Sequence, residues 1–192
     1  LIKIGTFHML ELLSPAGSPE AVIAAVQNGA DAVYMGMGNF NARRNAKNFT
    51  EEEFEKAVRY CRIRGCKTYL TLNTIVSDRE MEQALKHAKL AADVGVDALI
   101  VQDLGLVSVL RRALPRLELH ASTQMSVHNL SGARAVAELG IKRVVLAREL
   151  SFENIRYISQ NLNIETEVFV HGALCFCHSG QCYMSSLIGR RS

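Results

Sequence analysis

The chain has 192 residues, 48% of them hydrophobic and 21% charged, with a formal net charge of +3 and no tryptophan. This length suffices for one domain with a sizeable core, and an aromatic content of 6% argues against a stacking surface for single-stranded nucleic acid. No apolar stretch is long enough to span a bilayer. Five cysteines, with no signal-peptide layout before them, predict a cytoplasmic protein with reduced thiols and no membrane partner.

Short apolar runs alternate with amphipathic segments along most of the chain. Residues 1–8 fit this pattern poorly, and we interpret them as a cloning-derived tail, so that residues 9–192 form the domain. The runs contain mainly Val, Ile and Leu with little polar alternation, which is typical of parallel strands covered on both faces. We expect strands at residues 10–13, 32–35, 68–72, 98–101, 117–121, 144–147 and 166–170.

Helix signals lie between these runs. Helix starts are indicated by Ser18 before Pro19, by capping boxes of Thr50 with Glu53 and of Ser77 with Glu80, and by Ser151. Glycine recurs where helices should end, at Gly29, Gly95 and Gly140. The pattern predicts an α/β fold, a TIM-barrel-like (β/α) repeat with seven of its eight parallel strands in this chain. An open doubly wound sheet is the alternative, although residues 14–17 lack the glycine-rich dinucleotide turn.

Polar residues follow the predicted strands, at the end of a barrel where active sites lie. The candidates for substrate binding are Asn73, Gln102, Asp103, Gln124, Arg148, Glu149 and His171. Together they suit a small anionic ligand such as a dicarboxylate, and Arg148 is the best carboxylate clamp. Any one of them taken alone fits a helix cap or a turn better, and an ion pair of Arg148 with Glu149 explains that pair equally well.

Three of the five cysteines follow the last predicted strand, as Cys175, Cys177 and Cys182. Thiols beside His171 and His178 indicate zinc, an iron–sulfur cluster, or a catalytic cysteine paired with one of these histidines. The spacing matches no common structural zinc pattern. The remaining candidates have ordinary explanations: buried packing for Cys61 and Cys66, a helix or strand position for His87 and His120, and a solvated loop for Arg43, Arg44 and Lys47.

Residues 167–185 resemble the signature of the collagenase-like peptidases, peptidase family U32. The matching positions are Glu167, Phe169, Gly172-Ala173-Leu174-Cys175, Gly180, Cys182 and Met184-Ser185. Further segments with the same resemblance are 13–17, 29–34, 72–74, 102–103, 122–125 and 147–149, so it extends from Met9 to the end of the chain.

The resemblance implies two kinds of activity. The family is named for proteolysis, but its better-understood members are oxygen-independent hydroxylases of a uridine in tRNA, a cytidine in rRNA, or a quinone precursor. In these members four cysteines hold a four-iron four-sulfur cluster, and the members that act on RNA use prephenate as the hydroxyl source. By position, Cys175 and Cys182 match the first two cluster ligands, the other two fall beyond Ser192, and Cys177 matches none.

We therefore expect the N-terminal barrel of an iron–sulfur-dependent tRNA uridine hydroxylase that uses prephenate, and this piece need not be active alone. Its partners would be tRNA or another RNA, a small dicarboxylate and a related subunit. A collagenase-like protease is the alternative, although the sequence has neither a His-Glu-x-x-His helix nor a Gly-x-Ser-x-Gly elbow. A non-catalytic subunit that binds the cluster is the second alternative.

Overall fold

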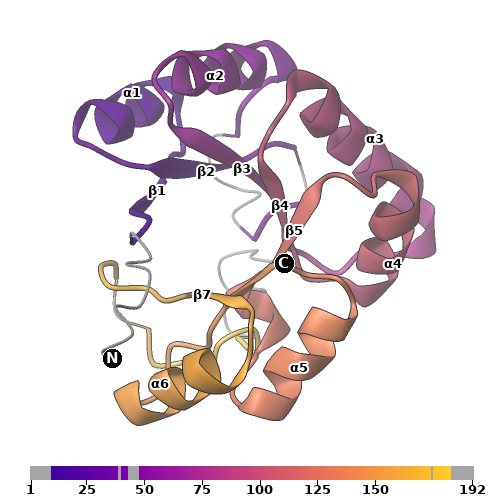
Figure 1. Cartoon of the computed structure of the whole chain (residues 1–192). Coiled ribbons are helices and arrows are strands. Elements are labelled where there is room, and N and C mark those ends of the chain that lie inside the picture. The colour runs from indigo at the N-terminus through magenta and orange to yellow at the C-terminus, as the bar shows by residue number, and fades with distance from the viewer. Residues whose placement is uncertain (1–9, 39, 43–47, 174, 183–192) are drawn as a thin grey trace, which may run out of the picture.

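The computed structural model describes residues 10–38, 40–42, 48–173 and 175–182. Within them, seven parallel strands form one sheet in sequential order, and Figure 1 shows this sheet curled into an open barrel with the helices outside. The strands are β1 (Leu13–Pro15), β2 (Ala32–Gly36), β3 (Lys67–Leu72), β4 (Ala98–Val101), β5 (Glu118–Ala121), β6 (Arg143–Val145) and β7 (Glu165–Glu167). Sequential order excludes the doubly wound alternative, in which the strand order reverses.

Six α-helices and one short 3-10 helix connect these strands in the described part of the chain. They are α1 (Pro19–Gln27), α2 (Glu51–Ile63), α3 (Asp78–Val94), α4 (Leu104–Ala113), η1 (Thr123–Met125), α5 (Leu130–Glu138) and α6 (Phe152–Asn161). The predicted start signals are confirmed, since Ser18 and Ser151 cap α1 and α6 and capping boxes begin α2 and α3. None of these helices is long and apolar enough to cross a membrane.

The two faces of the sheet carry different residues. Apolar side chains such as Met35, Leu70 and Leu99 belong to the main buried core, which includes residues of the outer helices. The residues that alternate with them face the interior of the barrel, where Tyr69, His120 and Arg143 are buried. The interior of this barrel therefore contains charged and aromatic groups in addition to aliphatic ones.

The seven predicted strands are confirmed, but some boundaries were wrong. The first strand begins at Leu13, and the last ends at Glu167, where residues 166–170 had been expected. The reason for the early end is that Leu146 donates its N–H to the Glu167 carbonyl, whereas the next amide, of Ala147, donates to Val127. Because the chain after β6 changes its hydrogen-bond partner at Ala147, Phe169 and Val170 do not pair with it as a strand. Their side chains are 50% and 85% exposed.

Several sequence predictions lie outside the described residues. These are the tail at residues 1–8, the basic residues Arg43, Arg44 and Lys47, and the signature positions Met184 and Ser185.

Candidate functional site

The cysteine loop, residues 175–182, lies against the connections that follow β5 and β6. Ser179 makes this contact and is fully buried. Its hydroxyl accepts hydrogen bonds from the backbone N and Nε of Arg148, each 3.1 Å long, and its N–H donates to Glu149 Oε1. Its carbonyl accepts from Ser126 Oγ at 2.6 Å. One serine thereby places the thiols beside the carboxyl end of the barrel.

Gly180 shows how closely the loop approaches the β5 connection. Its φ is +75°, a conformation that L residues rarely adopt, and an added Cβ would overlap Ser126 Oγ and the Gln124 carbonyl. Ser126 also has positive φ, at 57°, the single non-glycine case among the described residues. Both segments thus adopt a left-handed backbone conformation at their contact. Such uncommon conformations are found mainly at functional sites, where the surrounding structure holds them.

Arg148 contacts the cysteine loop as well as Ser179. Its Nη2 donates to the Cys177 carbonyl at 3.3 Å. A hydrogen bond from the Cys177 backbone, together with one from the Arg148 side chain, lowers the pKa of the exposed Cys175 thiol. In this structure Arg148 therefore holds the loop and favours a thiolate, and the carboxylate-clamp role stays a prediction.

The three thiols of the loop influence one another. Hydrogen bonding to Cys182 and repulsion from its sulfur raise the pKa of the Cys177 thiol, and Cys175 adds to this effect. Cys177 therefore lies in reach of both neighbours. A shared metal centre for Cys175 and Cys182 stays a prediction.

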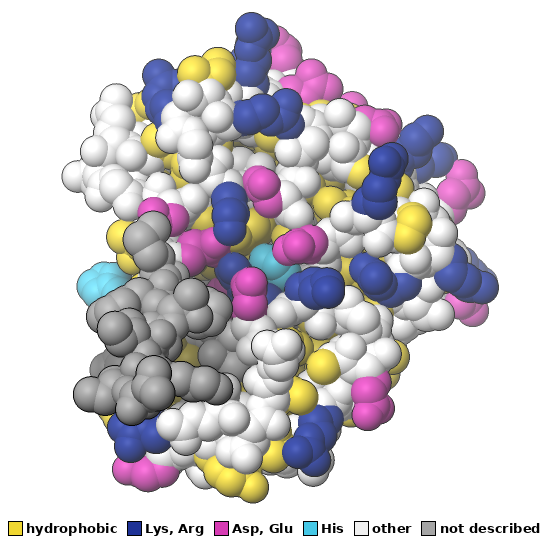
Figure 2. Space-filling view, viewed as in Figure 1, with side chains coloured by type: hydrophobic (Ala, Val, Ile, Leu, Met, Phe, Trp, Pro, Cys, Tyr) yellow, Lys and Arg dark blue, Asp and Glu magenta, His cyan; other side chains and the backbone are white. Residues whose placement is uncertain are grey.

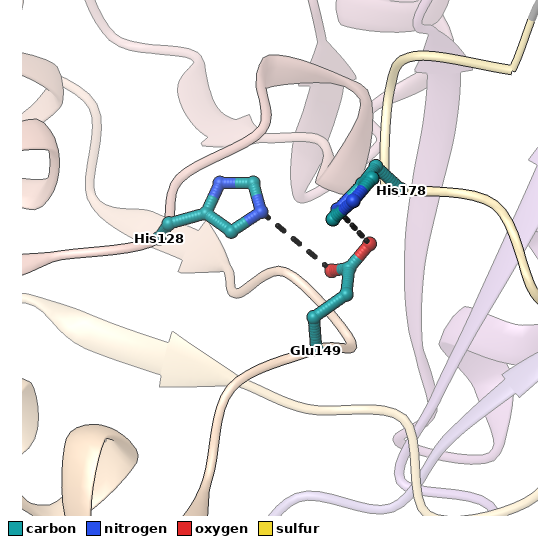
Figure 3. Close-up of side chains that lie close together, drawn as sticks. All are labelled: His128, Glu149 and His178. Atoms are coloured by element: carbon teal, nitrogen blue, oxygen red, sulfur yellow. Dashed lines mark ion pairs between the residues drawn. The ribbon is translucent and has the colours of Figure 1, made fainter.

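A second cluster lies beside the thiols and is drawn in Figure 3. Glu149 occupies its centre, with Oε2 at 3.7 Å from Nε2 of His128 and Oε1 at 3.7 Å from Nδ1 of His178. One ligand atom from each residue lies within 4.8 Å of those of the other two. The residues come from three segments: the β5–α5 connection, the β6–α6 connection, and the cysteine loop.

Comparison with known proteins identifies the family. The profile of peptidase family U32 matches residues 17–192. The chain belongs to peptidase family U32. It is similar to a 23S rRNA 5-hydroxycytidine synthase of Escherichia coli K12, with 44% identity over 93% of this chain and 27% of that protein. It is also similar to tRNA hydroxylation protein P1 of Bacillus subtilis 168, with 40% identity over 92% of this chain and 42% of that protein.

The fold agrees with this assignment. The solved structure of the U32 peptidase Mk0906 superposes with a TM-score of 0.73 at 21% identity, covering 88% of this chain and 71% of that one. The partial TIM-like barrel predicted from the sequence is therefore confirmed. The chain spans less than half the length of either relative.

Three further substrate-binding candidates of this U32 chain follow strands of the sheet and make hydrogen bonds within the protein. Asn73 accepts from the Ala42 N–H at 3.0 Å and donates to Ser122 Oγ at 3.2 Å. Gln102 Nε2 donates to the Gln124 carbonyl at 3.3 Å. Asp103 is the N-cap of α4. These contacts account for the three side chains structurally, while a role in substrate binding stays a prediction.

The outlying candidates differ in environment. His171 is exposed, and no contact of the described residues joins it to the cluster around Glu149. Cys61 and Cys66 are buried as expected, and burial raises the pKa of the Cys61 thiol to about 12, so neither belongs with the loop thiols.

Sequence reasoning did not single out His128 or Ser179. His128 immediately precedes Asn129, the N-cap of α5, so its place after a strand was a usable signal. Ser179 offered none, because its importance depends on partners about 30 and 53 residues away in the chain.

Proposed function

We propose that this chain is part of an oxygen-independent hydroxylase of RNA that carries an iron–sulfur cluster and uses prephenate. The observation that carries the proposal is the similarity, over more than nine tenths of the chain, to two proteins named for hydroxylated nucleosides in rRNA and tRNA. A tRNA uridine is the substrate expected from the sequence. Because the 44% identical relative is named for an rRNA cytidine, both RNAs belong in the test.

The residues present fit such a cluster. Thiolates are the usual iron–sulfur ligands, and the loop offers three thiols, of which Cys177 interacts with both Cys175 and Cys182. Cys175 and Cys182 would hold the cluster, with further ligands from elsewhere, and the cluster would supply one-electron chemistry. The lowered pKa of Cys175 favours the thiolate form that metals bind.

Arg148 is the residue to which we assign the ligand carboxylate. A guanidinium has five N–H donors, and the hydrogen bonds to the loop use Nε and Nη2. A dicarboxylate beside the loop would therefore meet an oriented fork at the mouth of the barrel. Such a contact is charge-assisted and directional.

The charge distribution limits where RNA would bind. Figure 2 shows Lys and Arg interspersed with Asp and Glu over the face that it presents, and the net charge is +3. Phosphate backbones are bound by clustered basic residues. We therefore do not propose this face, with its mixed charges, as the surface that contacts RNA. A cytoplasmic location stays a prediction.

The test uses the intact protein. Anaerobic reconstitution with iron and sulfide should give an iron–sulfur absorbance band, which Cys175→Ser and Cys182→Ser should abolish. Cys177→Ser is the matched control, since this thiol is in the same loop but matches no expected ligand. Mass spectrometry of tRNA and rRNA nucleosides from cells without the gene, with and without complementation, then identifies the substrate. An unchanged band in both cysteine variants would refute the cluster assignment.

Proteolysis is the second candidate, favoured by the family's description as a peptidase. The sequence has neither a His-Glu-x-x-His helix nor a Gly-x-Ser-x-Gly elbow. We expect the purified protein not to digest gelatin or casein. Cleavage that a single substitution in this chain abolishes would reverse the ranking.

A further inference from the structure

We propose that His128, Glu149 and His178 form a binding site for one divalent transition-metal ion, distinct from the cysteine thiols. Two imidazoles and one carboxylate are a donor set that binds Zn²⁺ and Fe²⁺ in proteins. The proposal rests on geometry and hydrogen bonding, and it does not depend on the RNA hydroxylase function.

The tautomer of His128 is the first argument. Its Nδ1 lies 2.6 Å from the Ser126 carbonyl oxygen, which can only accept a hydrogen bond. Nδ1 therefore carries the proton, and in a neutral imidazole Nε2 then bears a lone pair. Metal-binding histidines are commonly fixed in this way by a carbonyl on the other ring nitrogen.

The position of Glu149 is the second argument. Its Oε2 faces Nε2 of His128 at 3.7 Å. A lone pair and a carboxylate oxygen repel each other unless a proton or a cation lies between them. At 3.7 Å the two atoms are also too far apart for a good hydrogen bond. A metal ion between them would satisfy both atoms.

The spacing of the ligand atoms is the third argument. Zinc binds imidazole nitrogen at about 2.0–2.1 Å, so two ligands of one tetrahedral ion lie about 3.3 Å apart. The separations of 3.7 Å, one from each carboxylate oxygen of Glu149 to one histidine, are close to this value, and the three ligand atoms lie within 4.8 Å of one another. His178 is 78% exposed, so its side chain has room for the small rotation required.

The supporting contacts hold the three ligands in place. Ser179 receives hydrogen bonds from Arg148 and Ser126, and these join the segments that carry Glu149, His128 and His178. Glu149 Oε1 also accepts the Ser179 N–H. With three protein ligands, the ion would keep a further position for water or an exogenous ligand, as catalytic zinc sites do.

The experiment must separate this site from the thiols. Cys175, Cys177 and Cys182 are replaced together by Ser in the intact protein, which is then freed of metal. Titration with Co²⁺, followed by calorimetry and visible absorption, should show one equivalent bound and no thiolate-to-metal charge-transfer band. Competition with Zn²⁺ and with anaerobic Fe²⁺ then shows which ion binds more tightly.

Three variants test the ligands. In the thiol-free background, His128→Ala, Glu149→Gln and His178→Ala should each weaken Co²⁺ binding by more than about tenfold, the smallest effect expected even for an outer-shell partner. His171→Ala is the matched control, because it removes an exposed imidazole from the same region, and it should leave affinity unchanged. Circular dichroism confirms the fold, and His178→Ala is the safest variant since that side chain is exposed.

The opposite results are equally clear. Failure to bind one equivalent of Co²⁺ in the thiol-free protein would show that His128 and Glu149 form only an imidazolium–carboxylate pair. Equal affinities for the parent and all three variants would also overturn the proposal. Either result leaves the iron–sulfur test unaffected, because that test depends on the thiols.

Discussion

Arg143 Nη1 lies 2.5 Å from Glu11 Oε1 and so connects the first residue of β6 to the segment before β1, 132 positions earlier in the chain. Arg143 Nη2 also pairs with Glu165 on β7, at 2.6 Å. The Tyr69 hydroxyl donates to the same Glu11 oxygen at 2.8 Å. In Figure 1, β1 and β7 are the two edges of the sheet. The cluster therefore joins the segment before one edge strand to the other edge strand.

Arg143→Met should destabilise the fold strongly. The side chain of Arg143 is 10% exposed and that of Glu11 is 18% exposed, so the substitution would leave the Glu11 carboxylate with only the half-exposed Lys67 as its cation. Removing one partner of a buried pair costs about 3–5 kcal/mol. Urea unfolding measures the change. Lys56→Met removes a solvent-exposed cation from an i,i+4 pair with Glu52 and should leave the midpoint unchanged. Equal midpoints for the two variants would contradict the structural role of Arg143.

Two further groups contact this cluster, Glu167 beside Arg143 and His120 against the Tyr69 ring. The titration of Glu167 should oppose those of His120 and Glu11 in its effect on stability. Burial raises the pKa of Glu167 from 4.5 to about 7, so its contribution to stability is full below pH 4.5 and is lost as the pH rises to 7. Burial lowers the pKa of His120 from 6.5 to about 3, so its contribution is full above pH 6.5 and is lost on acidification toward 3. For Glu11, burial acts against hydrogen bonds from Arg143, Lys67 and Tyr69, which lower its pKa to about 2.

The variants Glu167→Gln and His120→Gln should therefore change the pH profile in opposite directions. Between pH 4.5 and 6.5 the slopes of Glu167 and His120 partly cancel in the parent protein. Glu167→Gln should lose stability steeply on acidification, by about 3 kcal/mol across the range, whereas His120→Gln should gain stability. Below pH 4.5 all forms should weaken as Glu11 is protonated. Thermal unfolding at several pH values measures this, and identical slopes for both variants would exclude the two groups as its source.

The sequence predicted the strands because each leaves a local apolar pattern, and it predicted the helix starts because capping residues act within three positions. It could not predict the Arg143 cluster, since Arg143 reads locally as a polar residue before a strand. The end of β7 at Glu167 was also hidden, because it depends on the change of partner at Ala147. At the site, the sequence indicated the thiols because three of them lie within eight residues. It could not indicate the grouping of His128 with Glu149, because these residues lie in different loops that only the fold brings together.

Gly180→Ala should displace the cysteine loop. The new Cβ would overlap Ser126 Oγ and the backbone oxygen of Gln124, and the φ of +75° adds strain. Gly29→Ala is the matched control, because Gly29 has a φ of +89° with no atom within 4 Å of an added Cβ, and so tests the backbone strain alone. We expect limited proteolysis to cleave near the loop several times faster in Gly180→Ala only. Equal cleavage in both variants would mean that the contact with Ser126 does not hold the loop.

Cys175 should be the thiol of the loop that alkylates fastest near neutral pH. Hydrogen bonds from the Cys177 backbone and from Arg148 lower its pKa, whereas the Cys177 pKa is raised by Cys182. Since the thiolate is the reactive form, Arg148→Ala should raise the Cys175 pKa and slow its alkylation several-fold. Arg156→Ala, which removes an arginine from α6, is the control and should have no effect on this rate.

The measurement is the rate of iodoacetamide labelling of each cysteine between pH 6 and 9, read by peptide mass spectrometry on metal-free protein. In the parent, the Cys175 profile should rise at lower pH than the Cys177 profile, and Arg148→Ala should move only the former. Arg148→Lys should restore part of the shift, because an ammonium supplies the charge without the planar fork that also reaches the Cys177 carbonyl. If Arg148→Ala labels as fast as the parent, the guanidinium does not stabilise the Cys175 thiolate, and its contact with the loop is limited to Ser179 and the backbone.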